Sequence, residues 1–103
     1  MYLVSIMYPH QDGARFDLDY YLKTHMKLVE KAMKPFGLKK WAVEKGLPAA
    51  NGKPSPYVCI GQLFFDSADG YDRAIAAKGT ELRGDLPNYT DIAPVRQVSE
   101  LVA

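Results

Sequence analysis

The chain opens with a run of apolar residues that is hydrophobic on both of its alternating faces. Residues 2–8 are rich in β-branched and aromatic side chains and are followed by Pro9, a pattern typical of a β-strand that ends at the proline. One face carries Tyr2, Val4, Ile6 and Tyr8, and the other carries Leu3, Ser5 and Met7. A strand that is apolar on both sides needs cover on both sides.

A polar stretch at residues 9–15 predicts a loop, and a helical pattern follows it. Asp17 is placed as an N-cap, with Phe16 before it as the outer half of a hydrophobic staple. The apolar stripe recurs with a helical period over four turns, and Pro35 and Gly37 end it. This stripe consists of Leu18, Tyr21, Leu22, His25, Leu28, Val29, Ala32 and Met33.

The second half of the chain predicts two strands, a helix and a last strand. Residues 38–47 and 57–65 alternate as strands around a loop at residues 48–56. Asp66 or Ser67 is expected to cap a helix that reaches about Lys78. Glycines at 79 and 84 predict a short or broken turn around residues 80–83, followed by a structured loop at 85–91 and a strand at 92–101.

The predicted order β-α-β-β-α-β indicates one α+β domain over residues 1–103 with a ferredoxin-like fold. We expect a four-stranded antiparallel sheet with two helices on one face. The other sheet face would stay apolar and exposed, and a two-fold partner is the simplest way to cover it. The sequence therefore predicts a homodimer.

Composition narrows the functional classes. The net charge is +1 with both signs interspersed, so no basic surface for nucleic acid is expected. The single cysteine, Cys59, lies in an apolar run and is expected to be a buried core residue. No leader or membrane-spanning run is recognisable, which favours a cytoplasmic protein without a membrane partner.

Known chemical motifs are absent, so the candidate chemistry depends on a few polar residues. The sequence has no phosphate-binding glycine loop, dinucleotide fingerprint, zinc spacing or nucleophile elbow. The two histidines, His10 and His25, lack a partner at metal-ligand spacing. We therefore expect neither a metal nor a cofactor.

His25 is the most informative residue because it lies within the apolar stripe of the first helix. It is either a core histidine bonded to a tyrosine hydroxyl or a backbone carbonyl, or a general acid/base in a cleft between helix and sheet. Tyr20 and Tyr21 are about 100° apart on the helix, and spacing favours Tyr21 as the inward one. Tyr8, Tyr21 and His25 could thus line a pocket, or could simply fill the core.

Residues 85–91 are a second candidate region. Its polar and amphipathic side chains either satisfy the backbone of their own loop or rim a ligand cleft or the dimer interface; they are Asp85, Asn88, Tyr89, Thr90 and Asp91. Polar side chains also interrupt the later strands, at Gln62, Arg96 and Gln97, and any of them that faces the interior needs a partner or a ligand.

Residues 16–29 (FDLDYYLKTHMKLV) resemble the helix signature of the EthD family, in the form FDxxYYxxxHxxLV. Residues 87–92 (PNYTDI) with Pro94 and Val95 are similar to that family's C-terminal motif, and residues 64–67 (FFDS) are also similar. A departure is Lys27, where many members carry proline. The resemblance implies a dimeric α/β barrel and an association with ethyl tert-butyl ether degradation, and its signature histidine corresponds to His25.

The leading hypothesis is a cofactor-independent enzyme that acts on a small hydrophobic organic compound in catabolism. Related barrels include isomerases, dehydratases, cyclases and monooxygenases, which the resemblance implies only by analogy of fold. His25 would move a proton with Tyr21 or Tyr8 as partner, while Asn88, Tyr89 and Asp91 would contact substrate. The alternatives are a non-catalytic binding or accessory protein for a hydrophobic metabolite or partner oxygenase, and a scaffold whose cleft is filled by side chains.

Overall fold

A computed structural model describes residues 1–103 and gives the element order expected from the sequence. The strands are β1 (Tyr2–Pro9), β2 (Leu38–Lys45), β3 (Tyr57–Phe65) and β4 (Val95–Glu100). The first helical segment (residues 18–36) consists of α1 (Leu18–Tyr20), the π-helical turn η1 (Tyr21–His25), α2 (Met26–Met33) and the 3-10 turn η2 (Lys34–Phe36). The second consists of α3 (Gly70–Gly84) and the 3-10 turn η3 (Leu86–Asn88).

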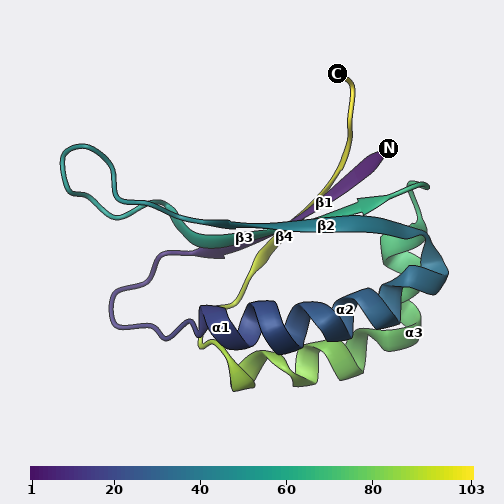
Figure 1. The fold of residues 1–103 in the computed structure, drawn as a ribbon, viewed down its shortest axis with the longest axis horizontal. Helices are drawn as coiled ribbons and strands as arrows, with labels where there is room; N and C mark the ends of the chain where they lie inside the picture. The colour runs from purple at the N-terminus through teal and green to yellow at the C-terminus, as the bar shows by residue number, and fades with distance from the viewer.

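The four strands form one antiparallel sheet in the order β2-β3-β1-β4. Both helical segments lie against the same face of this sheet (Figure 1). The two chain ends lie at the same end of the sheet, where the Leu101 amide donates to the Met1 carbonyl. The ferredoxin-like βαββαβ prediction is confirmed.

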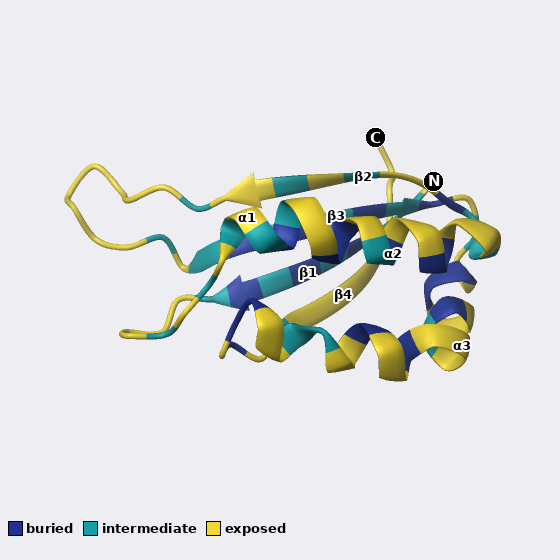
Figure 2. Ribbon diagram, turned by 60° about the horizontal axis from the view of Figure 1, so that its bottom comes forward, coloured by how far each residue is buried: buried dark blue, intermediate teal, exposed yellow.

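The hydrophobic core lies between the sheet and the helices (Figure 2). Every second residue of β1 and β3 is buried on the helix-covered face, including Val4, Tyr8 and Cys59. Burial raises the pKa of the Cys59 thiol to about 12, as expected for an unreactive core cysteine. Strand β4 is exposed along most of its length because it lies at the sheet edge.

The opposite sheet face has no cover within the chain (Figure 1). Its apolar side chains are partly exposed, and Met7 of β1 lies directly opposite Ile60 of β3. Gln62 and Gln97 lie on this face, because each pairs across the sheet with Ser5. The surface is therefore apolar with a polar row across it, which is more mixed than the sequence pattern suggested.

The first helical segment begins as predicted, because the Asp17 carboxylate accepts a hydrogen bond from the Tyr20 amide. One turn later the helix widens, and the Met26 amide donates to the Tyr21 carbonyl, five residues earlier. The additional residue in this turn places both His25 and Met26 in the core. The regular helical period predicted His25 there but missed Met26.

The second helix differs from the prediction at both ends. It begins at Gly70, and its N-cap, Asp69, makes no side-chain capping bond, so neither Asp66 nor Ser67 caps it. The expected break around residues 80–83 is wrong, because α3 continues through Gly79 to Gly84. A helical glycine costs only about 1 kcal/mol relative to alanine, and buried Gly79 lies where a side chain would crowd Ile75 and Arg83.

Two strand ends also differ. Strand β2 ends at Lys45, and Leu47, expected within it, is 72% exposed in the following loop. The last strand begins at Val95 rather than at residue 92, and Ile92 lies buried in the loop before it. None of the helices combines the length and the apolar character needed to cross a bilayer.

Candidate functional site

A mostly apolar cavity of about 240 Å³ lies between the helices and the covered sheet face. Strands contribute Ile6, Tyr8, Leu63 and Arg96, and the first helical segment contributes Tyr21, His25, Val29 and Met33. The second contributes Tyr71, Ile75, Leu82, Arg83 and Leu86. Few polar groups converge in an otherwise hydrophobic wall, which is the usual pattern of a small-molecule site.

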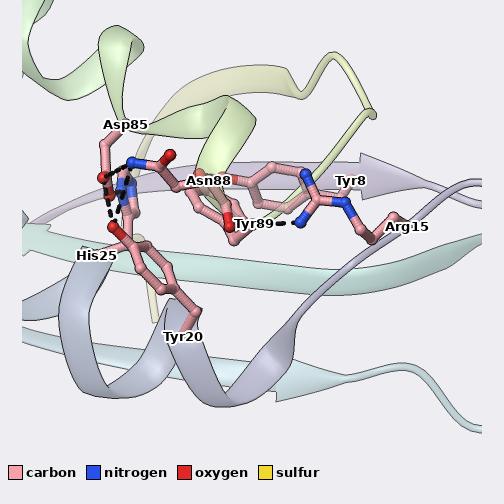
Figure 3. Close-up of polar contacts among 7 residues, drawn as sticks. All are labelled: Tyr8, Arg15, Tyr20, His25, Asp85, Asn88 and Tyr89. Carbon is pink, nitrogen blue, oxygen red and sulfur yellow. Dashed lines mark hydrogen bonds and ion pairs between the residues drawn. The ribbon is translucent and has the colours of Figure 1, made fainter.

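The cavity-lining His25 is paired with a largely buried carboxylate, that of Asp85. Nδ1 of His25 lies 2.8 Å from Oδ2 of Asp85, and the two side chains are only 7% and 12% exposed. The π-helical turn holds His25, while Asp85 follows the last residue of α3 (Figure 3). Docking of the two helical segments therefore forms the pair.

The Asp85 carboxylate is held by further donors on its other oxygen. The Tyr20 hydroxyl donates to Oδ1 over 2.7 Å, and the Asn88 amide donates to the same oxygen over 2.9 Å. Burial raises the pKa of Asp85, but the hydrogen bonds from Tyr20, Asn88 and His25 outweigh it and leave that pKa below its ordinary value. Asp85 is thus a carboxylate at neutral pH and can only accept hydrogen bonds.

His25 is held as a neutral imidazole with a defined tautomer. Burial lowers the pKa of His25, and the bond to Asp85 offsets only part of this effect. Because a carboxylate only accepts, the proton of the neutral ring is assigned to Nδ1. Nε2 forms no hydrogen bond with the protein. Every fully buried side-chain nitrogen or oxygen has a hydrogen-bond partner. Nε2 is therefore not fully buried. Nε2 carries a free lone pair at the cavity.

Aromatic side chains pack around His25. The Tyr21 ring stacks on His25 with centroids 5.5 Å apart, and the Tyr89 ring lies 4.6 Å away at a tilt. The hydroxyls of Tyr8 and Tyr89 share a 2.8 Å hydrogen bond (Figure 3). Burial raises the pKa of Tyr8, Tyr21 and Tyr89, so all three remain neutral and able to donate.

Arg15, which does not line the cavity, holds the loop at residues 87–91 in place. Its guanidinium donates to the backbone carbonyls of Pro87 and Asn88, and its backbone amide donates to the Asp91 carboxylate over 3.1 Å. The Thr90 hydroxyl donates to the Arg15 carbonyl. These contacts hold residues 87–91 against the start of the first helical segment.

Three of the predicted site residues reach the cavity and three do not. His25, Tyr21 and Tyr8 line it. Asn88 holds Asp85 and Tyr89 lies buried behind the wall, whereas Asp91 is exposed beside Arg15. A purely structural role predicted that the His25 ring would bond a tyrosine hydroxyl or a backbone carbonyl. The ring bonds neither of these, and its partner is the Asp85 carboxylate.

The sequence placed Asp85 and Arg96 among polar residues that could meet a ligand, but it assigned neither of them a role in the site, and it gave no signal for Arg83. Asp85 carried a weak signal, as an acidic residue in the polar stretch after the second helix. Arg96 carried a clearer one, as a charged residue within an apolar strand. No cluster of three or more histidine, cysteine or acidic side chains that could hold a metal ion is present, and the only side-chain hydrogen bond of His10 is to Asp12.

The fold and the site together define a ferredoxin-like α+β protein in which a histidine on the wall of a mostly apolar cavity is bonded to a carboxylate behind it. An EthD-like protein from Ralstonia eutropha is 42% identical, with a TM-score of 0.93 over 99% of this chain and 92% of that chain. The chain belongs to the EthD family.

More distant structures share the fold alone. An EthD family protein from Bacillus halodurans is 16% identical, with a TM-score of 0.67 over 99% of both chains. A dimeric ferredoxin-like protein from an uncultured marine organism is 14% identical, with a TM-score of 0.55 over 100% of this chain and 96% of that chain. No family model and no curated protein sequence matches the chain.

Proposed function

We propose that this protein is a cofactor-independent enzyme that transfers a proton on a small, mostly apolar organic compound. The observation that supports this function is the His25 ring, with Nδ1 bonded to Asp85 and Nε2 free, on the wall of a mostly apolar cavity. Isomerisation, dehydration and cyclisation all include such a step. A place in the catabolism of a small organic compound, as the family name suggests, belongs to this proposal.

His25 would act as the general base. Its neutral form accepts the substrate proton on Nε2, and the imidazolium that forms is stabilised by the adjacent Asp85 carboxylate over 2.8 Å. Asp85 also keeps the ring in the one tautomer that leaves Nε2 free. The same nitrogen then returns the proton to another atom of the substrate.

Tyr8 and Tyr21 would orient the substrate and stabilise its developing negative charge. Both line the cavity with His25, and both stay protonated because burial raises their pKa. A neutral hydroxyl of a buried tyrosine is an effective donor to a forming oxyanion. The cavity volume of about 240 Å³ lies below the usual range for ligand pockets, about 300–1,000 Å³, which favours a small substrate.

The proposal includes a homodimer that covers the open sheet face. Met7 and Ile60 lie side by side on that face with no partner in the chain. A second sheet packed there would bury these residues and leave the cavity, on the opposite face, accessible in each protomer.

Deuterium exchange tests proton transfer without knowledge of the substrate. Small apolar ketones and enones are incubated with the protein in D2O, and loss of the proton next to the carbonyl is followed by NMR. Exchange on at least one of them should be faster with the wild type, and His25→Gln should lower the rate by about 10²–10⁴-fold. Binding without exchange across the panel would instead favour a carrier of a hydrophobic metabolite, and equal exchange by His25→Gln would exclude His25 as the base.

A further inference from the structure

Two solvent-exposed arginines that line the cavity have no acidic partner. Arg83 of α3 and Arg96 of β4 both line it, and neither forms an ion pair with a carboxylate. The chain's other two arginines are both paired, each at 3.9 Å: Arg15 with Asp91, and Arg73 with Asp69. Neither of the paired arginines lines the cavity. The unpaired cations of this type are therefore gathered at one place.

The position of Arg83 depends on a glycine one helical turn earlier. A Cβ on Gly79 would lie 2.8 Å from Nη1 of Arg83, so the missing side chain leaves room for the guanidinium to fold back along α3. Gly79 is buried in the middle of a helix, where alanine would be favoured by roughly 1 kcal/mol. This packing gives a physical reason for a glycine that helix propensity disfavours.

The position of Arg96 depends on the strand register. Arg96 of β4 pairs directly with Ile6 of β1, which places its side chain on the helix-covered face of the sheet. It lies near the Tyr71 hydroxyl: burial raises the pKa of Tyr71, and the adjacent Arg96 guanidinium offsets part of that rise. The amide side chains of Gln62 and Gln97 face the opposite side.

We propose that Arg83 and Arg96 form an anion subsite and that the substrate is a small apolar carboxylic acid. Guanidinium groups suit this ligand because their donors match the two oxygens of a carboxylate. The apolar body of the acid would occupy the cavity beside Ile6, Val29 and Leu63, within reach of the His25 ring that lines the same space.

The inference rests on the proposed function and refines it. Removal of a proton from an anionic substrate adds a second negative charge, which is costly beside the apolar side chains that form most of the wall. Two guanidinium groups offset that charge before and during the transfer. Arg83 and Arg96 would thus make the substrate proton easier for His25 to remove, because they stabilise the charge that its removal creates.

Binding of a matched pair of probes tests the subsite separately from catalysis. Benzoate and benzamide have the same ring and differ in charge, and their affinities can be compared by calorimetry or by NMR titration. A hydrogen bond to a charged group contributes roughly 1.5–3 kcal/mol, so the wild type should prefer benzoate by about tenfold or more. Higher salt should weaken benzoate binding and leave benzamide binding unchanged.

The double variant Arg83→Met/Arg96→Met should lose this preference because methionine keeps an apolar stem and removes the charge. Arg73→Met, on the same helix outside the cavity, serves as the control and should keep it. Equal binding of the two probes by the wild type, a preference that survives in the double variant, or benzoate binding that is insensitive to salt would each overturn the inference. The salt dependence needs no variant, so the test does not depend on folding of the double variant.

His25→Gln separates this inference from the proposed function. The variant should keep the benzoate preference even though it loses proton exchange. A wild type that prefers benzoate but exchanges no proton would refute the enzymatic proposal alone. A wild type that exchanges protons without preferring benzoate would refute the anion subsite alone.

Discussion

Nδ1 of His25 and Oδ2 of Asp85 lie 2.8 Å apart although 60 residues separate them in the chain. The histidine is the last residue of a π-helical turn, and the aspartate follows the last residue of α3. The two residues come close together only because both helical segments pack on the same face of the sheet. The chemical site is therefore a product of the tertiary fold, and it can be tested through either partner.

Asp85→Asn should lower proton-exchange activity by about 10²–10⁴-fold with little change in fold. An amide can donate to Nδ1 as well as accept from it, so the ring is no longer held in the tautomer that leaves Nε2 free. Loss of the carboxylate should also lower the pKa of His25 further, because the hydrogen bond and charge of Asp85 raise it. Exchange kinetics and an NMR titration of the imidazole protons measure the two effects.

Asp91→Asn is the matched control for that variant. Asp91 lies in the same polar stretch but is exposed and contacts Arg15 rather than His25. Its substitution should leave both the exchange rate and the titration of His25 unchanged. An equal loss of activity in both variants would mean that the effect of Asp85 comes from the loop and not from the histidine.

Protein stability should fall on acidification below about pH 6.5 through His25. Burial lowers its pKa in the folded state below the ordinary value of 6.5, so the unfolded chain binds the proton more readily. Stability then decreases from the ordinary pKa down to the folded-state pKa and levels off below it. Urea unfolding from pH 8 to pH 5 should show this slope in the wild type, and a shallower one in His25→Gln. Identical slopes would contradict the buried neutral state of His25.

Local patterns in the sequence were sufficient for the fold. The strand at residues 57–65 and the N-cap at Asp17 follow from alternation and side-chain chemistry, and both are present. The break at residues 80–83 is absent because it depended on glycine propensity, which takes no account of the packing of Arg83 against Gly79. Tertiary contacts determined the outcome there.

The candidate site could be predicted only in part for the same reason. His25 and Tyr21 were identified because they share one helix face within a single element. Asp85 and Arg96 join them through the docking of α3 and the register of β4, which no local pattern encodes. The π-helical turn also depends on tertiary packing, since nothing in the sequence YLKTH distinguishes it from an ordinary helical turn.

Gly61→Ala should destabilise the protein by about 1–3 kcal/mol through overpacking. A Cβ at this position would overlap the hydroxyl of Tyr21, which lies against β3. The added Tyr21→Phe substitution removes that oxygen and should recover much of the loss, so a double-mutant cycle by denaturation should give a clear coupling energy. Gly84→Ala, where a side chain meets open space, should not destabilise the protein. Purely additive effects at residues 21 and 61 would contradict the close approach.

Ile60→Glu should convert the proposed dimer to a monomer. Ile60 lies on the open sheet face next to Met7, where a second sheet would bury it, and an unpaired carboxylate cannot be buried there without a large desolvation cost. Leu47→Glu alters an exposed apolar residue in the hairpin loop and should leave the assembly intact. Analytical ultracentrifugation at micromolar concentration should give a dimer mass for the wild type and Leu47→Glu and a monomer mass for Ile60→Glu. A wild type that sediments as a monomer would refute the dimer, while the cavity on the opposite face could still be tested in the isolated chain.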